Sequence, residues 1–139
     1  MFENHPVLDG AFSWAAWDNG NAYKSVEEDH IYMDGARRNG KIYMAGVSPW
    51  FFTHFNYKNW VYKSEALFTT RWEQIVALQP DLVEIITWND YGESHYIGPI
   101  DGAFPAGSEV WTIGYDHTAW LDMASYYIAA YKAGSYPAV

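Results

Sequence analysis

The 139-residue chain contains no cysteine, so neither a disulfide framework nor thiolate chemistry is available to it. Basic side chains are scarce, since eight Lys and Arg stand against 17 Asp and Glu, and the formal net charge is −9. Nucleic acids and anionic membranes both attract basic surfaces, so this balance disfavours both as partners. No run of about 18 apolar residues occurs, and we expect no transmembrane helix.

Patterns for metals and cofactors are also missing. The five histidines are scattered along the chain, and no His-x-x-x-His pair occurs among them. Gly-rich phosphate loops of the forms G-x-G-x-x-G and G-x-x-x-x-G-K-[ST] are absent, as is the G-x-S-x-G elbow of serine hydrolases. The sequence therefore predicts no metal site, no cofactor and no serine nucleophile. The first six residues also lack the basic start and apolar core of a signal peptide.

The pattern of apolar residues predicts short strands that alternate with amphipathic helices. Strands are expected at 10–14, 41–47 and 82–87, and helices at about 25–38, 65–79 and 118–133. The order β-α-β-α-β-loop-α predicts a parallel α/β sheet with right-handed crossovers. No linker or internal repeat interrupts it, so we interpret residues 1–139 as a single domain.

The first predicted helix carries most of the clustered charge. Ser25 and Glu28 fit a capping box, in which each side chain satisfies a free backbone N–H. The acidic residues 27–29 lie in the first turn and the basic residues 37–38 in the last, as the helix dipole favours. We expect these charges to form a solvated outer face.

Aromatic residues make up 19% of the chain, and many of them lie in segment 48–60. This segment is too polar to be core throughout, and so many rings are unfavourable in open water. We predict a loop that folds over the end of the sheet as a binding wall, with Trp50 as its best stacking candidate. The alternative is that the segment covers a hydrophobic rim.

The predicted strand at 82–87 is a β-branched apolar run of the kind that a sheet buries on both faces. The next nine residues, 88–96, contain two carboxylates, an amide, a histidine and three aromatic rings. Active sites of α/β proteins lie at the carboxyl ends of such strands. Asp90 and Glu93 can serve there as the acid and base of a glycosidase. In the simpler interpretation, Asp90 caps the turn and Glu93 is solvated.

Residues 88–99, Trp-Asn-Asp-Tyr-Gly-Glu-Ser-His-Tyr-Ile-Gly-Pro, closely resemble the signature of glycoside hydrolase family 71, the fungal α-1,3-glucanases or mutanases. Segments 9–17, 43–51 and 117–123 are similar to that family too, in the same order. The resemblance implies a (β/α)8 TIM barrel, secretion or a cell-wall location, and endo-type hydrolysis of α-1,3-glucan with inversion. Such a barrel needs about 250 residues, so the chain is expected to be a partial barrel with about three β/α units.

On that resemblance Asp90 and Glu93 are the catalytic pair. Their surroundings in the sequence suggest Asp90 as the base and Glu93 as the acid, and the reverse assignment stays open. Inversion requires carboxyl groups about 6.5–9.5 Å apart, and a separation near 5 Å would count against it. The residues expected to bind the sugar are Trp14, Trp17, Trp50, Trp88, Asn89, Tyr91 and His95.

A second class of function is open from the sequence. The same aromatic residues could bind α-glucan without cutting it, because a partial barrel lacks the rest of its cleft. The strand edges that a partial barrel exposes would also favour self-association. The expected partner is thus an uncharged α-glucan polysaccharide in either case, with no nucleic acid and no membrane.

Overall fold

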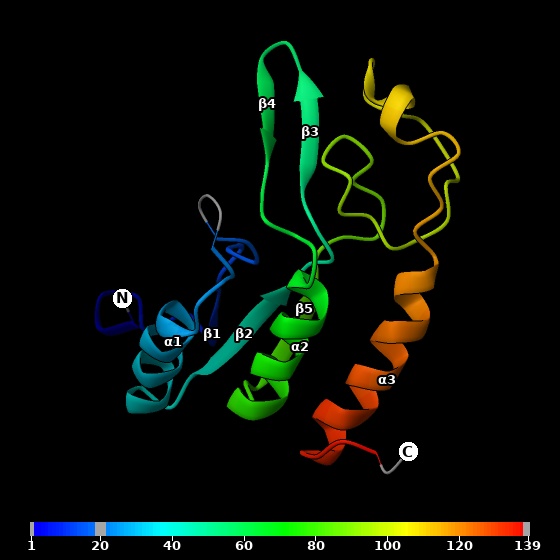
Figure 1. The fold of residues 1–139 in the computed structure, drawn as a ribbon. Coiled ribbons are helices and arrows are strands. Elements are labelled where there is room, and N and C mark those ends of the chain that lie inside the picture. Colours follow the sequence, from blue (N-terminus) through cyan, green and yellow to red (C-terminus); the bar gives the residue numbers. More distant parts are fainter. Residues whose placement is uncertain (1, 19–21, 138–139) are drawn as a thin grey trace.

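The structure of the chain, a computed structural model, describes residues 2–18 and 22–137 (Figure 1). Its regular elements are η1 (Phe2–Asn4), β1 (Gly10–Phe12), α1 (Glu27–Arg38), β2 (Ile42–Val47), β3 (Phe52–Phe55), β4 (Lys58–Val61), α2 (Leu67–Leu78), β5 (Leu82–Ile85), η2 (Ser108–Trp111) and α3 (Ala119–Ala133). None of the helices within these described ranges is long and apolar enough to span a membrane.

Strands β1, β2 and β5 form a parallel sheet in the order β1-β2-β5. Gly10 pairs with Ile42 at one side of the central strand, and Ala45 pairs with Val83 at the other. Helix α1 connects the first pair and α2 the second, which confirms the predicted succession of parallel β/α units. Because the strands run in one direction, their carboxyl ends meet at one edge of the sheet.

Strand β5 is not buried on both faces as the sequence suggested. Leu82 and Glu84 are exposed, whereas Val83 and Ile85 are half-buried. The physical reason is that β5 lies at the edge of the described sheet. There it has only one neighbouring strand, and only one of its faces is covered. A run of apolar residues therefore indicated a strand correctly but not its degree of burial.

The core lies between the sheet and the helices α1, α2 and α3. Helix α2 buries Phe68, Trp72 and Ile75 on one stripe, as its spacing predicted. Helix α3 packs against this stripe, and the ring of Tyr127 stacks on Trp72 with 5.9 Å between the ring centroids. Trp120 meets Phe68 edge to face at 5.0 Å.

Segment 48–60 is a β-hairpin rather than the predicted loop. Strands β3 and β4 pair in antiparallel fashion, with Phe52 opposite Val61 and Phe55 opposite Lys58, around a two-residue turn. The mixture of polar and aromatic residues, which made the segment look too polar for a core, suits a hairpin whose two faces have different surroundings. The hairpin stands above the carboxyl edge of the sheet, beside the long segment between β5 and α3 (Figure 1).

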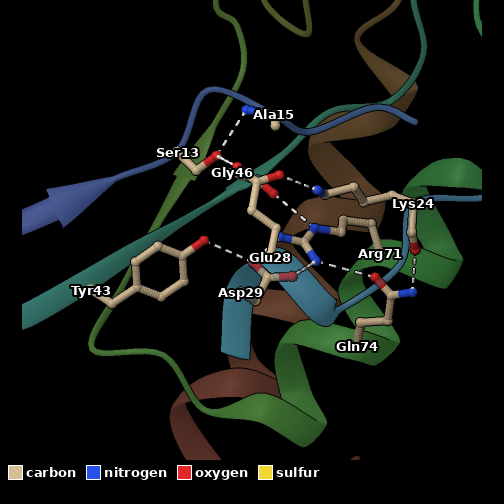
Figure 2. A network of polar contacts seen from close by, with 9 residues as sticks. All are labelled: Ser13, Ala15, Lys24, Glu28, Asp29, Tyr43, Gly46, Arg71 and Gln74. Atoms are coloured by element: carbon tan, nitrogen blue, oxygen red, sulfur yellow. Dashed lines mark hydrogen bonds and ion pairs between the residues drawn. The ribbon is translucent and has the colours of Figure 1, made fainter. Parts of the chain in front are cut away.

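The expectation that all charges of α1 face solvent is wrong. Val26 is the N-cap of the helix, and no side-chain capping bond forms there in the described structure. Glu28 instead contacts Ser13 and Lys24, and Asp29 is buried in an ion pair with Arg71 of α2 (Figure 2). The charges at 37–38 are exposed as expected. The helix dipole favours acidic residues in a first turn but does not determine which of them the rest of the fold covers.

Candidate active site

The predicted motif forms a compact loop directly after β5. The backbone N–H of Thr87 donates to the carbonyl of His95 at 2.7 Å, and the N–H of Ile97 donates back to Thr87 at 2.9 Å. The N–H of Gly98 donates to the carbonyl of Trp88 at 2.9 Å. The two sides of the loop thus hold each other, and its side chains project from a fixed backbone.

Asp90 caps the turn inside this loop. Its backbone N–H donates to the Thr87 hydroxyl at 2.9 Å, and its Oδ1 accepts the backbone N–H of Glu93 at 3.0 Å. The capping role of the simpler interpretation is therefore real, but it uses only one oxygen of the carboxylate. Oδ2 points to His95 instead.

His95 lies beneath both carboxylates. Its Nε2 is 3.2 Å from Oδ2 of Asp90 and 3.0 Å from Oε2 of Glu93. The ring is 0% exposed, held between the edge of Trp17 and the face of Phe51. His95, expected from the sequence to bind sugar, has no surface to offer a ligand in this arrangement. Its place is that of a support that ties the two acids together.

This support brings the two acids close. One oxygen of Asp90, one of Glu93 and a ring nitrogen of His95 all lie within 4.8 Å of one another. The nearest oxygens of the pair thus approach more closely than the whole carboxyl groups of inverting glycosidases, which stand about 6.5–9.5 Å apart.

The same three residues form a set of donors that could hold a metal ion, but their surroundings do not favour one. A metal-bound histidine usually donates its second ring N–H to a partner. Nδ1 of His95 is buried and has no hydrogen-bond partner among the described residues. The cation next to Glu93 is the ammonium group of Lys58, which forms an ion pair with Oε1.

Glu93 lines a cleft with a volume of about 680 Å³. One wall is formed by Lys58 and Trp60 of β4 and by Tyr62, which follows this strand. The segment before α1 and the first turn of α1 supply the other wall. Of the predicted binding residues, Trp14 and Trp17 line this cleft. Trp14 is 54% exposed, so its ring is free to stack on a sugar.

The remaining predicted binding residues lie elsewhere. Trp50 lines a second, mainly apolar cavity of about 330 Å³, and its Nε1 donates to the carbonyl of Ser94 at 2.5 Å. Trp88 is 56% exposed and Asn89 is exposed, but neither is among the described residues that line either cavity. Tyr91 is only 5% exposed, and its hydroxyl donates to the carbonyl of Pro99 at 3.0 Å, so it supports the loop from below.

Two aromatic residues support the far side of the loop. The ring of His117 stacks on Tyr96 with 3.8 Å between centroids, and Nδ1 of His117 donates to the Tyr96 carbonyl at 3.0 Å. Burial raises the pKa of Tyr96 to about 12, so its hydroxyl keeps its proton and donates to the carbonyl of Tyr115 at 2.5 Å. Burial lowers the pKa of His117 below its ordinary value.

The opposite wall of the cleft rests on a network of polar contacts (Figure 2). Glu28 accepts hydrogen bonds from the Ser13 hydroxyl and the Lys24 ammonium group, both at 2.8 Å. These bonds, with that to Lys24 the strongest, hold the pKa of Glu28 below its ordinary value. Gln74 of α2 donates to the Lys24 carbonyl at 2.7 Å. The network thus connects α2 to the segment that carries Trp14.

The residues expected to bind sugar do not include three that line the cleft with Glu93, namely Lys58, Trp60 and Tyr62. The signal that could have found them is their spacing. Residues two apart on a strand project from the same face, so one functional side chain on β4 implies its neighbours. A loop has no such period, so the prediction of a loop at 48–60 did not indicate this relationship.

A parallel β/α sheet with two carboxylates beside an aromatic cleft at its carboxyl edge is the arrangement of barrel-type glycoside hydrolases. The sequence profile described as glycosyl hydrolase family 71 matches residues 1–139. The chain belongs to this family, which confirms the resemblance seen in residues 88–99.

Two curated relatives are similar over most of the chain. Glucan endo-1,3-alpha-glucosidase agn1 of Schizosaccharomyces pombe is 54% identical over 128 residues, which is 92% of this chain and 30% of that protein. A mutanase of Penicillium rubens is 53% identical over 135 residues, covering 91% of this chain and 30% of that protein. The chain thus spans about a third of the length of these relatives.

A solved structure supports the fold. The GH99 endo-alpha-mannosidase from Bacteroides thetaiotaomicron matches 91% of this chain and 39% of its own chain, with a TM-score of 0.64. The sequences are 12% identical, so the match concerns the arrangement of the backbone alone.

Proposed function

We propose that this chain hydrolyses α-1,3-glucosidic linkages in α-1,3-glucan and that Asp90 and Glu93 are its catalytic pair. The observation that carries the proposal is the position of Glu93, which opens into a cleft lined by tryptophans while His95 ties it to Asp90. The names of the relatives, a glucan endo-1,3-alpha-glucosidase and a mutanase, support the choice of linkage. We further propose that the three-stranded sheet is part of a (β/α)8 barrel.

The chemistry of the cleft suits an uncharged polymer. The side chains of Trp14 and Trp60 are partly exposed and line the cleft, where an indole ring can stack on the C–H face of a glucose ring. A two-carboxylate mechanism then needs one acid to protonate the leaving oxygen and one base to activate water. A net charge of −9 does not oppose binding of a neutral glucan.

The roles of the two acids depend on Lys58. An ion pair with Lys58 uses the carboxylate form of Glu93, whereas a general acid must carry a proton. We therefore propose the assignment that the sequence left open, with Glu93 as the base and Asp90 as the acid, because the ion pair with Lys58 stabilises the carboxylate form of Glu93. An α-1,3-linked gluco-oligosaccharide with an activated aryl leaving group tests the assignment. On this substrate, only the variant that lacks the general acid should keep most of the rate of the unaltered chain.

Inversion is the stereochemical outcome that we propose, as the family resemblance implies. It requires the two carboxyl groups to stand about 6.5–9.5 Å apart in the reacting complex so that a water fits between them, whereas retention requires about 5–5.5 Å. Proton NMR of the first products separates the two outcomes. Inversion of an α-linkage gives the β-anomer first, and early α-anomer would contradict this part of the proposal.

The deciding experiment is release of reducing sugar from insoluble α-1,3-glucan by the chain, by Asp90→Asn and by Glu93→Gln. We expect each substitution to lower the release rate by about 10²–10⁴-fold. Asp101→Asn is the matched control, because Asp101 is an exposed carboxylate in the next segment. Unchanged release by both variants would contradict the assignment of the pair. Binding to the glucan without release, by a chain that unfolds cooperatively, would favour a glucan-binding fragment.

The substrate also suggests where the protein works and what it contacts. An α-1,3-glucan of a fungal wall lies outside the membrane, so we propose a secreted or wall-associated protein. Within the described sheet, β1 and β5 each have one neighbour only, and these edges are proposed sites of self-association. Light scattering across a range of protein concentrations tests this, and a constant monomer mass would contradict it.

A further inference from the structure

The β3–β4 hairpin lies between the cleft that contains Glu93 and the second, mainly apolar cavity. Lys58, Trp60 and Tyr62, two residues apart, line the cleft that contains Glu93. Phe52 and Val61, which pair directly across the hairpin, line the second cavity. The alternation of side chains along a strand thus gives the hairpin one face toward the candidate active site.

On that face, Lys58 is held in a defined place. Its Nζ forms an ion pair with Oε1 of Glu93 and lies 5.2 Å from the ring centroid of Trp60 and 5.6 Å from that of Phe51. The two rings stack on each other with their centroids 6.1 Å apart. The side chains of Lys58 and Glu93 are 30% and 18% exposed, so the pair is partly shielded from water. A cation near aromatic faces and a carboxylate loses much of the freedom of an ordinary surface lysine.

The hairpin also holds the backbone of Glu93. The N–H of Phe52, the first residue of β3, donates to the Glu93 carbonyl at 3.1 Å. The second side-chain oxygen of Glu93 lies 3.0 Å from Nε2 of His95. The carboxylate is therefore held between a cation on the hairpin and a histidine beneath the loop. A change in either partner must change where the carboxylate points.

We propose that Lys58 is a positioning residue for Glu93. It keeps the carboxylate turned into the cleft and supplies the positive charge opposite it, which makes the hairpin part of the active site as well as its wall. A neutral glucan brings no cation that could take its place. The inference rests on the proposed function in one respect, since the rate effect requires Glu93 to be catalytic.

The test compares three lysine variants on α-1,3-glucan. Lys58→Met keeps the length and the apolar stem but removes the charge, while Lys58→Arg keeps a cation. Lys63→Met is the matched control, because Lys63 follows β4 and lies 4.6 Å from the ring centroid of Tyr23. We expect Lys58→Met to lower kcat by about 10²-fold, the effect of a misplaced reacting group, with KM changed less than about twofold. Lys58→Arg should recover most of kcat, and Lys63→Met should leave both constants unchanged.

A change in KM alone, or an unchanged kcat in Lys58→Met while Glu93→Gln is inactive, would overturn the inference and leave the proposed function intact. If the unaltered chain releases no sugar, or if Asp90→Asn and Glu93→Gln keep full activity, the proposed function fails instead. The Lys58–Glu93 contact is then tested by a double-mutant cycle, in which thermal unfolding is measured for Lys58→Met, Glu93→Gln and the double variant. A loss of Tm in the double variant smaller than the sum of the single losses supports positioning, and additive losses overturn it.

Discussion

The carboxylate of Asp29 on α1 meets the guanidinium group of Arg71 on α2 with two hydrogen bonds of 2.7 Å, and both side chains are 1% exposed (Figure 2). Nε of Arg71 donates to the carbonyl of Gly46 in β2 at 2.9 Å, and the Tyr43 hydroxyl donates to Asp29 at 2.8 Å. One ion pair thus joins both connecting helices to the central strand, close to the carboxyl edge where the candidate active site lies.

Removing one partner of this pair should be strongly destabilising. Arg71→Met leaves the Asp29 carboxylate buried without its cation, and we expect a loss of about 3–5 kcal/mol in the free energy of unfolding. The double variant Asp29→Leu, Arg71→Met removes both charges and should regain part of that loss. Urea denaturation measures both. Glu73→Gln on the exposed side of α2 is the control and should change stability by less than about 0.5 kcal/mol. A loss that small in Arg71→Met would contradict the prediction.

Acid should weaken the fold through Asp29. Burial by itself would raise the pKa of Asp29, but the hydrogen bonds and the charge of Arg71, with the bond from Tyr43, outweigh burial and hold the pKa below its ordinary value of 3.8. A carboxyl group whose pKa is lowered by folding stabilises the fold at any pH above its pKa in the unfolded chain. This contribution is lost as the pH falls below 3.8. We expect Asp29→Asn to show a shallower fall in Tm over this range than the unaltered chain. Parallel curves would show that Asp29 does not contribute in this way.

His117 should produce a second loss of stability at milder pH. Burial lowers its pKa below 6.5, although the bond to the Tyr96 carbonyl and the charge of Asp116 oppose this in part. The unfolded chain therefore takes up a proton first, and the stabilisation present above pH 6.5 is lost as the pH falls below it. Thermal unfolding between about pH 7 and 5 should show a smaller decline for His117→Gln. His5→Gln, at an exposed histidine, should behave like the unaltered chain.

Gly98 should be intolerant of any side chain. A Cβ at this position would lie 2.6 Å from Cε2 of Trp88 and 2.7 Å from the Trp88 carbonyl oxygen. Gly98→Ala must therefore push Trp88 and the loop apart, and we expect a loss of about 1–3 kcal/mol in stability together with weaker retention on α-1,3-glucan. Gly102→Ala is the control, because a Cβ there meets nothing within 4 Å. Equal stability of the two variants would show that the loop adapts without cost.

Several elements could be predicted from the sequence alone because their signals are local. The stripe of Phe68, Trp72 and Ile75 predicted both the helix and its buried face, since a helix turns every 3.6 residues whatever surrounds it. The polar motif after β5 was located for the same reason, because a change of composition is visible in the chain itself. The hairpin was missed because its strands, Phe-Thr-His-Phe and Lys-Asn-Trp-Val, have no alternation of polar and apolar residues and form by pairing with each other.

The sequence by itself determined the family, the order of the β/α units and the acids that carry the proposed chemistry, because each of these depends on residues close together along the chain. Only the tertiary structure decided which charges are buried and what touches Glu93. Arg71 reaches Asp29 across 42 positions, and Lys58 reaches Glu93 from a different element altogether. Contacts of this kind arise when separate elements pack together, and no local pattern records which side chains will then meet.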